Sequence, residues 1–127
     1  MSYPTYLDVH HTLAWCVIIG NALVGVWALA AQYVPVLRLR LLWIMIVVAE
    51  LLPFAIAFVG VLIVNRFGVK LDEQHALYGF SALITVGILY SYRGSPFVKD
   101  KRYLLYGFGS LFLMGLGLRA MYLGVTR

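Results

Sequence analysis

Long runs without a charged residue dominate this sequence and decide what the chain can fold into. Five such runs cover most of its 127 residues, at 9–37, 41–49, 51–65, 74–92 and 103–118. Only 12% of the residues are charged and 63% are hydrophobic, whereas soluble domains have roughly 25% charged and about 45–50% apolar residues. Such a chain has too little polar surface for a water-soluble globule. We therefore expect one integral membrane domain over residues 1–127 and no separate soluble domain.

Four transmembrane helices account for these runs, because a bilayer core about 30 Å thick takes about 20 residues of helix. We expect them at about 12–33, 41–64, 73–92 and 103–123. The connections are short, which predicts an all-α fold with consecutive helices as antiparallel neighbours in one bundle. Six lysines and arginines lie in the first and third connections, and three lie on the opposite side. The positive-inside rule then places both termini outside the cytoplasm.

Glu50 is the most unusual residue in these spans. It lies about 14 Å into the second predicted helix, where a charge costs at least about 3 kcal/mol. One interpretation is an acid that handles protons or binds a partner; the other is a protonated or hydrogen-bonded side chain that holds the bundle together. Asn21, at a comparable depth in the first helix, is the nearest candidate partner. Pro53 frees the carbonyl of Ala49, so we also expect a kink and an unsatisfied acceptor there.

Three histidines form the second group of candidates. His10 and His11 precede the first predicted span and His75 opens the third, so all three are expected at one membrane interface. Two imidazoles from different helices can bind haem b axially, and histidines beside carboxylates can hold a transition metal. No CxxCH or HxxxH motif supports either chemistry. We therefore expect polar caps, with no metal and no cofactor of the chain's own. Haem b bound by His75 with His10 or His11 is the alternative.

Arg119 and a short repeat mark the fourth span. The side chain of Arg119 can reach the headgroups or contact a larger partner protein. The sequence LYGF occurs at 77–80 and again at 105–108, each time followed by a leucine and a glycine at the same spacing. Small residues let helices approach closely in lipid. We therefore predict that the third and fourth helices pack through their glycines, namely Gly79, Gly87, Gly107 and Gly115.

The sequence lacks the motifs of an enzyme. It has no phosphate-binding glycine loop, no Ser-His-Asp set and no paired carboxylates on one helix face. Its net charge of +5 comes from basic residues in short connections, so it does not indicate nucleic-acid binding. Cys16 is expected to be a buried, inert thiol. We expect a non-catalytic protein whose partners are lipid and larger membrane subunits, with no soluble substrate. A proton-conducting or transport subunit built on Glu50 is a further alternative.

Several motifs resemble one family of small actinobacterial membrane proteins. They are HTLAW at 11–15 with Asn21 and GVWAL at 25–29, HALYGF at 75–80 with YSYR at 90–93, and YLLYGFG at 103–109 with Arg119 and Ala120. Over nearly its whole length the chain resembles the supercomplex association factor found with the cytochrome bcc–aa3 respiratory supercomplex. The resemblance implies an accessory subunit in a bacterial plasma membrane, without a redox centre of its own, that assists assembly or stability. It carries no catalytic residue over to this chain.

Overall fold

Four long α-helices make up the computed structural model, which describes residues 2–126 and the side chains of residues 2–123. α1 is Tyr3–Tyr33, α2 is Arg40–Phe67, α3 is Glu73–Tyr92 and α4 is Arg102–Thr126. Two short 3-10 turns, η1 (Pro35–Leu37) and η2 (Pro96–Val98), lie in the first and third connections. The described residues contain no strand. The predicted all-α fold is therefore confirmed.

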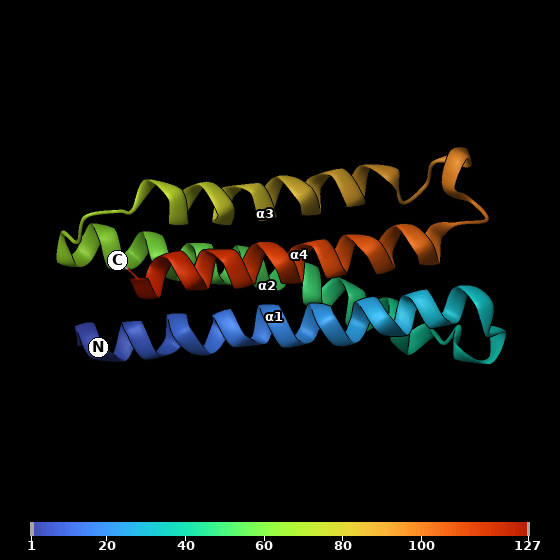
Figure 1. The fold of residues 1–127 in the computed structure, drawn as a ribbon, viewed down its shortest axis with the longest axis horizontal. Helices are drawn as coiled ribbons and strands as arrows, with labels where there is room; N and C mark the ends of the chain where they lie inside the picture. The colour runs from blue at the N-terminus through green and yellow to red at the C-terminus, as the bar shows by residue number, and fades with distance from the viewer. Residues whose placement is uncertain (1, 127) are drawn as a thin grey trace.

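The first and last helices share the most extensive contact of the bundle. α1 packs along α2 and along α4, and α3 packs along α4, whereas α2 makes few contacts with α3 or α4. Successive helices run in opposite directions, and the two ends of the chain lie at the same end of the bundle (Figure 1). As a result, α4 lies between α1 and α3.

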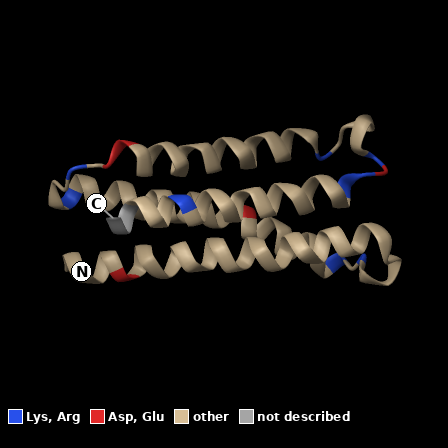
Figure 2. Cartoon of the chain, viewed as in Figure 1, with Lys and Arg blue, Asp and Glu red and all other residues tan. Residues whose placement is uncertain are grey.

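Three of the four helices are long and apolar enough to cross a membrane, namely α1, α2 and α4. α3 is not among them: its 20 residues include three polar residues at its start and three tyrosines, so it is less apolar than the other helices. Lysine, arginine and acidic residues gather mainly toward the two ends of the bundle (Figure 2). The structure is therefore compatible with a membrane protein, and it supports three spans by length and composition.

α1 and α2 extend beyond the apolar runs that predicted them. α1 begins at Tyr3, well before residue 12, with Pro4 in its first turn, where the missing N–H of proline does no harm. Tyr3 and Tyr6 pack edge-on against Phe67, with ring centroids 5.1 and 5.4 Å apart. α2 ends at Phe67, and Gly68 follows with a φ of 63°, a left-handed conformation that favours glycine. Aromatic contacts between the two helix ends therefore add turns that hydropathy alone does not predict.

α3 begins and ends at the predicted residues, 73 and 92. Its start is fixed by Asp72, whose carboxylate accepts a hydrogen bond from the backbone N–H of His75 at 2.9 Å. Such a cap satisfies one of the free N–H groups in the first helical turn. The same contact sets the position of the His75 backbone.

Glycines set the closest approach between α1 and α4. A Cβ added at Gly25 would lie 3.0 Å from the carbonyl oxygen of Gly107. A Cβ added at Gly107 would lie 3.0 Å from the backbone nitrogen of Leu29 and 2.7 Å from the side chain of Leu29. On the other side of α4, a Cβ at Gly109 would lie 2.6 Å from Leu89 of α3. The glycines of α4 therefore allow both α1 and α3 to pack closely against it.

This arrangement differs from the glycine packing predicted between α3 and α4. A Cβ added at Gly79, Gly87 or Gly115 would meet no atom within 4 Å. Gly107 is closely packed, but its neighbour is α1 and not α3. The repeat suggested that α3 and α4 pack through matching glycines. In the structure α4 contacts both α1 and α3, so Gly107 faces α1 while Gly109 faces α3. Three of the four predicted glycines are left with open space beside them.

Candidate functional site

Asn21 and Glu50, two of the polar residues predicted inside the spans, lie in the interior of the bundle. Asn21 of α1 is fully buried and Glu50 of α2 is 9% exposed. The Nδ2 of Asn21 donates to the carbonyl oxygen of Val17 at 2.9 Å and to that of Ala49 at 3.3 Å. Pro53 deprives the Ala49 carbonyl of its helical donor. Asn21 therefore satisfies the acceptor that the proline leaves open, one residue before Glu50.

Four buried side-chain oxygen atoms have no hydrogen-bond partner among the described residues, namely Asn21 Oδ1, Gln32 Oε1, Glu50 Oε1 and Ser110 Oγ. Asn21, Glu50 and Ser110 are themselves buried residues. Ser110 lies about one turn beyond Gly107 in α4, and Asn21 lies one turn before Gly25 in the antiparallel α1. The two residues therefore occupy similar levels of the bundle. An unsatisfied buried polar atom costs free energy. A protonated carboxyl group or an ordered water molecule can supply a donor to an oxygen atom of this kind.

Tyr106, one turn before Ser110 on α4, contacts both α3 and α2. Its side chain is buried, and its hydroxyl donates to the carbonyl oxygen of Leu89 at 2.8 Å. Its ring also packs edge-on against Trp43, with centroids 5.5 Å apart. The sequence analysis missed Tyr106 and Ser110. Their spacing of four residues, continued by the buried Leu113, places them on one face of α4 and was the available signal.

Two of the three histidines lie together at the end of the bundle that also holds the chain termini. The rings of His10 on α1 and His75 on α3 have centroids 6.0 Å apart and planes inclined by 44°. The Nδ1 of His75 lies 2.7 Å from the carbonyl oxygen of Ala120 on α4. The Nε2 of His10 would lie 3.3 Å from a Cβ added at Gly60 on α2. Residues from all four helices therefore surround this pair.

His11 points away from this pair. It is exposed, and Trp15 Nε1 donates a hydrogen bond to its Nε2 at 3.2 Å. Successive residues of an α-helix point about 100° apart, so neighbouring histidines on α1 face different surroundings. Cys16 lies beside Trp15 and is exposed, not buried as predicted. Within residues 2–126, no group of three or more His, Cys, Asp or Glu residues is placed to hold a metal ion.

Arg119 lies on the surface of α4, apart from the polar residues of the interior. Its guanidinium carbon is 6.0 Å from the ring centre of Tyr78 on α3 and 5.3 Å from that of Tyr122. Contacts of this kind between a cation and an aromatic face stabilise the pair. Arg119 therefore helps to join α3 to α4 on the surface, whereas Glu50 and Asn21 act inside.

Comparison of the chain with protein-family models, curated proteins and solved structures gives no match. The fold defines the class of the protein as an α-helical bundle with helices suited to a membrane.

Proposed function

We propose that this chain is a non-catalytic accessory subunit of a bacterial respiratory supercomplex of the cytochrome bcc–aa3 type. It would assist assembly or stability by packing its outer helix faces against larger membrane subunits in the plasma membrane. The resemblance of the sequence motifs to one family is the reason for naming this complex. The uncovered apolar face of α3 supports a role in binding larger subunits.

α3 packs mainly against α4 and leaves an apolar face uncovered. This is the observation that carries the proposal. The face includes Leu77, Phe80, Ile84 and Ile88, whose side chains are 49–62% exposed, and Gly87 has open space where a Cβ would lie. Yet α3 is not apolar enough by itself to qualify as a membrane span. A helix of this kind is better matched to another protein helix than to lipid, and a glycine lets that helix approach closely.

α4 extends the same kind of surface. Phe108 and Phe112 are 61% and 58% exposed, and Gly115 has no atom within 4 Å of an added Cβ. In contrast, the predicted polar anchors Glu50 and Asn21 are buried. The proposed contact with larger subunits is therefore apolar and shaped by glycines.

Co-purification from the organism's own membranes tests this proposal. The tagged chain, extracted in mild detergent, should show haem a, b and c bands together in a reduced-minus-oxidised spectrum. A Cβ added at Gly87 or Gly115 meets no atom within 4 Å. We therefore expect Gly87→Leu and Gly115→Leu to keep the fold and lose most of the co-purified haem. Ala55→Leu on the exposed face of α2 is the matched control and should keep it. A wild-type preparation without a and c bands would overturn the proposal.

We also propose that α3 crosses the membrane as a fourth span and that both termini lie outside the cytoplasm. Covering of α3 by a partner would offset its lower hydropathy, and the excess of lysine and arginine around η1 and η2 supports this orientation. In a Cys16→Ser background, Lys70→Cys should react with an impermeant thiol reagent in intact cells. Phe97→Cys, at a side chain that is 93% exposed, should react only after permeabilisation. Labelling of both positions from one side would show that α3 does not cross.

A further inference from the structure

We propose that a groove between α3 and α4 binds an anionic phospholipid, with its headgroup at Lys101 and an acyl chain along α4. The groove has a volume of about 540 Å³. Lys101 carries the charge of its lining, and the other lining residues are apolar. They include Leu89 of α3, Val98 of η2, and Leu104, Phe108 and Phe112 of α4. The proposal does not depend on whether the chain binds larger subunits.

A fixed contact between α3 and α4 forms one side of this groove. Leu89 is 4% exposed, and a Cβ added at Gly109 would lie 2.6 Å from its side chain. The hydroxyl of Tyr106 donates to the carbonyl oxygen of Leu89 at 2.8 Å. The two helices are thus held together at this level. The groove therefore exists before a ligand arrives, as is usual for small-molecule sites.

The groove has the depth of one membrane leaflet. Its α4 residues recur at intervals of three and four, which places them on one face of the helix. From Lys101 to Phe112 the chain rises about 16 Å, and half of a bilayer core is about 15 Å thick. The groove begins with a cation and continues with apolar side chains over the depth of a leaflet. A phospholipid has the same order of charged headgroup and hydrocarbon.

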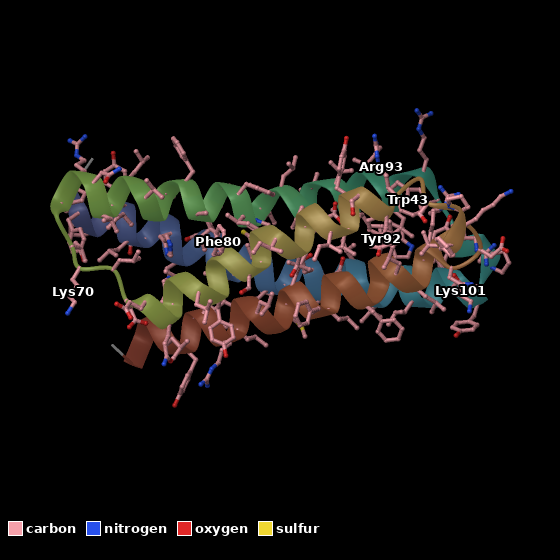
Figure 3. The ribbon with its side chains drawn as sticks, turned by 90° about the horizontal axis from the view of Figure 1, so that it is seen from above. Trp43, Lys70, Phe80, Tyr92, Arg93 and Lys101 are labelled. Carbon is pink, nitrogen blue, oxygen red and sulfur yellow. The ribbon has the colours of Figure 1, made fainter. Side chains whose placement is uncertain are left out.

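The charge around the open end of the groove is complementary to an anionic headgroup. Residues 93–102 contain four basic residues and one acidic residue, Asp100. Lys101 and Arg93 lie at the same end of the bundle, and Lys70 lies at the opposite end (Figure 3). Basic pockets between membrane helices bind the headgroups of anionic lipids. This charge favours an anionic phospholipid over a zwitterionic one.

Of the four basic residues in this connection, Lys101 is the one that lines the groove. The guanidinium carbon of Arg93 lies 4.4 Å from the centre of a tyrosine ring of α3. The guanidinium carbon of Arg102 lies 6.0 Å from the ring centre of Trp43 on α2. Lys99 is exposed and lies outside the lining. Lys101 is therefore the residue placed to hold the phosphate of the headgroup.

Native mass spectrometry of the isolated full chain in mild detergent tests the site without any partner subunit. Titration with dioleoyl phosphatidylglycerol should saturate at one lipid per chain, whereas dioleoyl phosphatidylcholine should bind more weakly. Lys101→Gln removes the charge in the groove and should weaken binding of phosphatidylglycerol about fivefold. Lys99→Gln is the matched control, because it removes a neighbouring charge outside the groove, and it should have a smaller effect. Circular dichroism verifies that each variant keeps its helices.

A second set of measurements tests the apolar part of the groove. Dihexanoyl phosphatidylglycerol has the same headgroup but short chains, so it should bind more weakly than the dioleoyl lipid. Inorganic phosphate should not compete. Phe112→Ala removes a wall at the deep end of the groove and should weaken binding of the dioleoyl lipid only. Phe58→Ala, at a side chain of α2 that is 66% exposed, is the control and should bind as the wild type does.

Three results would overturn the proposal: equal binding of the two dioleoyl lipids, equal weakening by Lys101→Gln and Lys99→Gln, or displacement of the lipid by inorganic phosphate. The last result would indicate a site for small anions. Phe108 and Phe112 also belong to the surface proposed for larger subunits, so a bound lipid would border that contact. Gly87→Leu separates the two proposals, because Gly87 lies outside the lining of the groove. This variant should lose the partner subunits and keep the lipid.

Discussion

Asn21 donates a hydrogen bond to the carbonyl oxygen of Ala49 across 3.3 Å, from the first helix to the second. That carbonyl has no helical donor because Pro53 occupies the position four residues later. A free carbonyl in a membrane interior costs several kcal/mol if nothing satisfies it. The asparagine and the proline therefore form a matched pair, although they are far apart in the sequence.

A double-mutant cycle should reveal this coupling. Pro53→Ala restores an N–H that can donate to Ala49, so Asn21→Leu should be less harmful in that background than in the wild type. We expect a coupling free energy of about 0.5–1.5 kcal/mol, the usual range for hydrogen bonds between membrane helices. Unfolding by SDS in mixed micelles, followed by circular dichroism, measures it. Additive effects of the two substitutions would mean that the contact does not satisfy the carbonyl.

Glycines inside the contact between α1 and α4 should respond oppositely to a glycine outside it. Gly25→Ala and Gly107→Ala push a methyl group to within 3.0 Å or less of the facing helix, and overpacking of this kind costs about 1–3 kcal/mol. Gly115→Ala meets no atom within 4 Å and gains helix propensity, so stability should hold or rise by up to about 1 kcal/mol. The same unfolding assay ranks the three variants. Equal losses at Gly107 and Gly115 would contradict the packing described above.

Glu50→Gln should leave both insertion and partner retention unchanged. The side chain is 9% exposed and lies inside the bundle, so a larger subunit cannot reach it without rearranging the helices. The amide keeps the shape of a protonated carboxyl and supplies donors for the unsatisfied oxygens nearby. Co-purification of a, b and c haems with the variant measures the result. Loss of those haems, with the helical content intact, would restore Glu50 as an anchor for a partner.

Arg38 should stabilise the C-terminal end of α1. Its guanidinium donates to the carbonyl oxygens of Ala31 and Gln32, each at 2.7 Å, and cations are favourable at this end of a helix. Arg38→Ala should cost about 1 kcal/mol and accelerate amide hydrogen exchange in the last turn of α1. Arg40→Ala removes the same charge two residues further along, at the first residue of α2, and is the control. Similar exchange rates in the two variants would show that the charge matters and the hydrogen bonds do not.

Much of the helical architecture follows from the sequence, because long apolar runs and short connections leave few alternatives. The limits of α3 are predictable for a local reason: Asp72 caps its first turn. The start of α1 is not, because it depends on Tyr3 and Tyr6 packing against Phe67 from a distant part of the chain. Which helices pack against each other is harder to predict, because the sequence does not show which neighbouring helix a glycine on α4 faces.

The sequence identifies which types of residue form the candidate sites, but not every residue that belongs to them. The sequence singles out Glu50 and Asn21 as interior polar residues, and it notes the carbonyl freed by Pro53. It does not choose between His10 and His11, because that choice depends on the rotation of α1 about its axis. His10 shares a helical face with Asn21, Ala28 and Ala31, which are fully buried. That periodicity is the signal that distinguishes His10 from its neighbour.

The contact of α1 with α4 has a consequence for how the chain is made. Helices enter the membrane in the order of synthesis, so α1 and α2 can associate early as a hairpin. α3 then arrives with few contacts to α2, and it gains its main neighbour only when α4 follows. We therefore expect the close approach at Gly25 and Gly107 to form last. A chain that ends before α4 would lack the contact between α1 and α4, and its α3 would have few contacts with the rest of the protein.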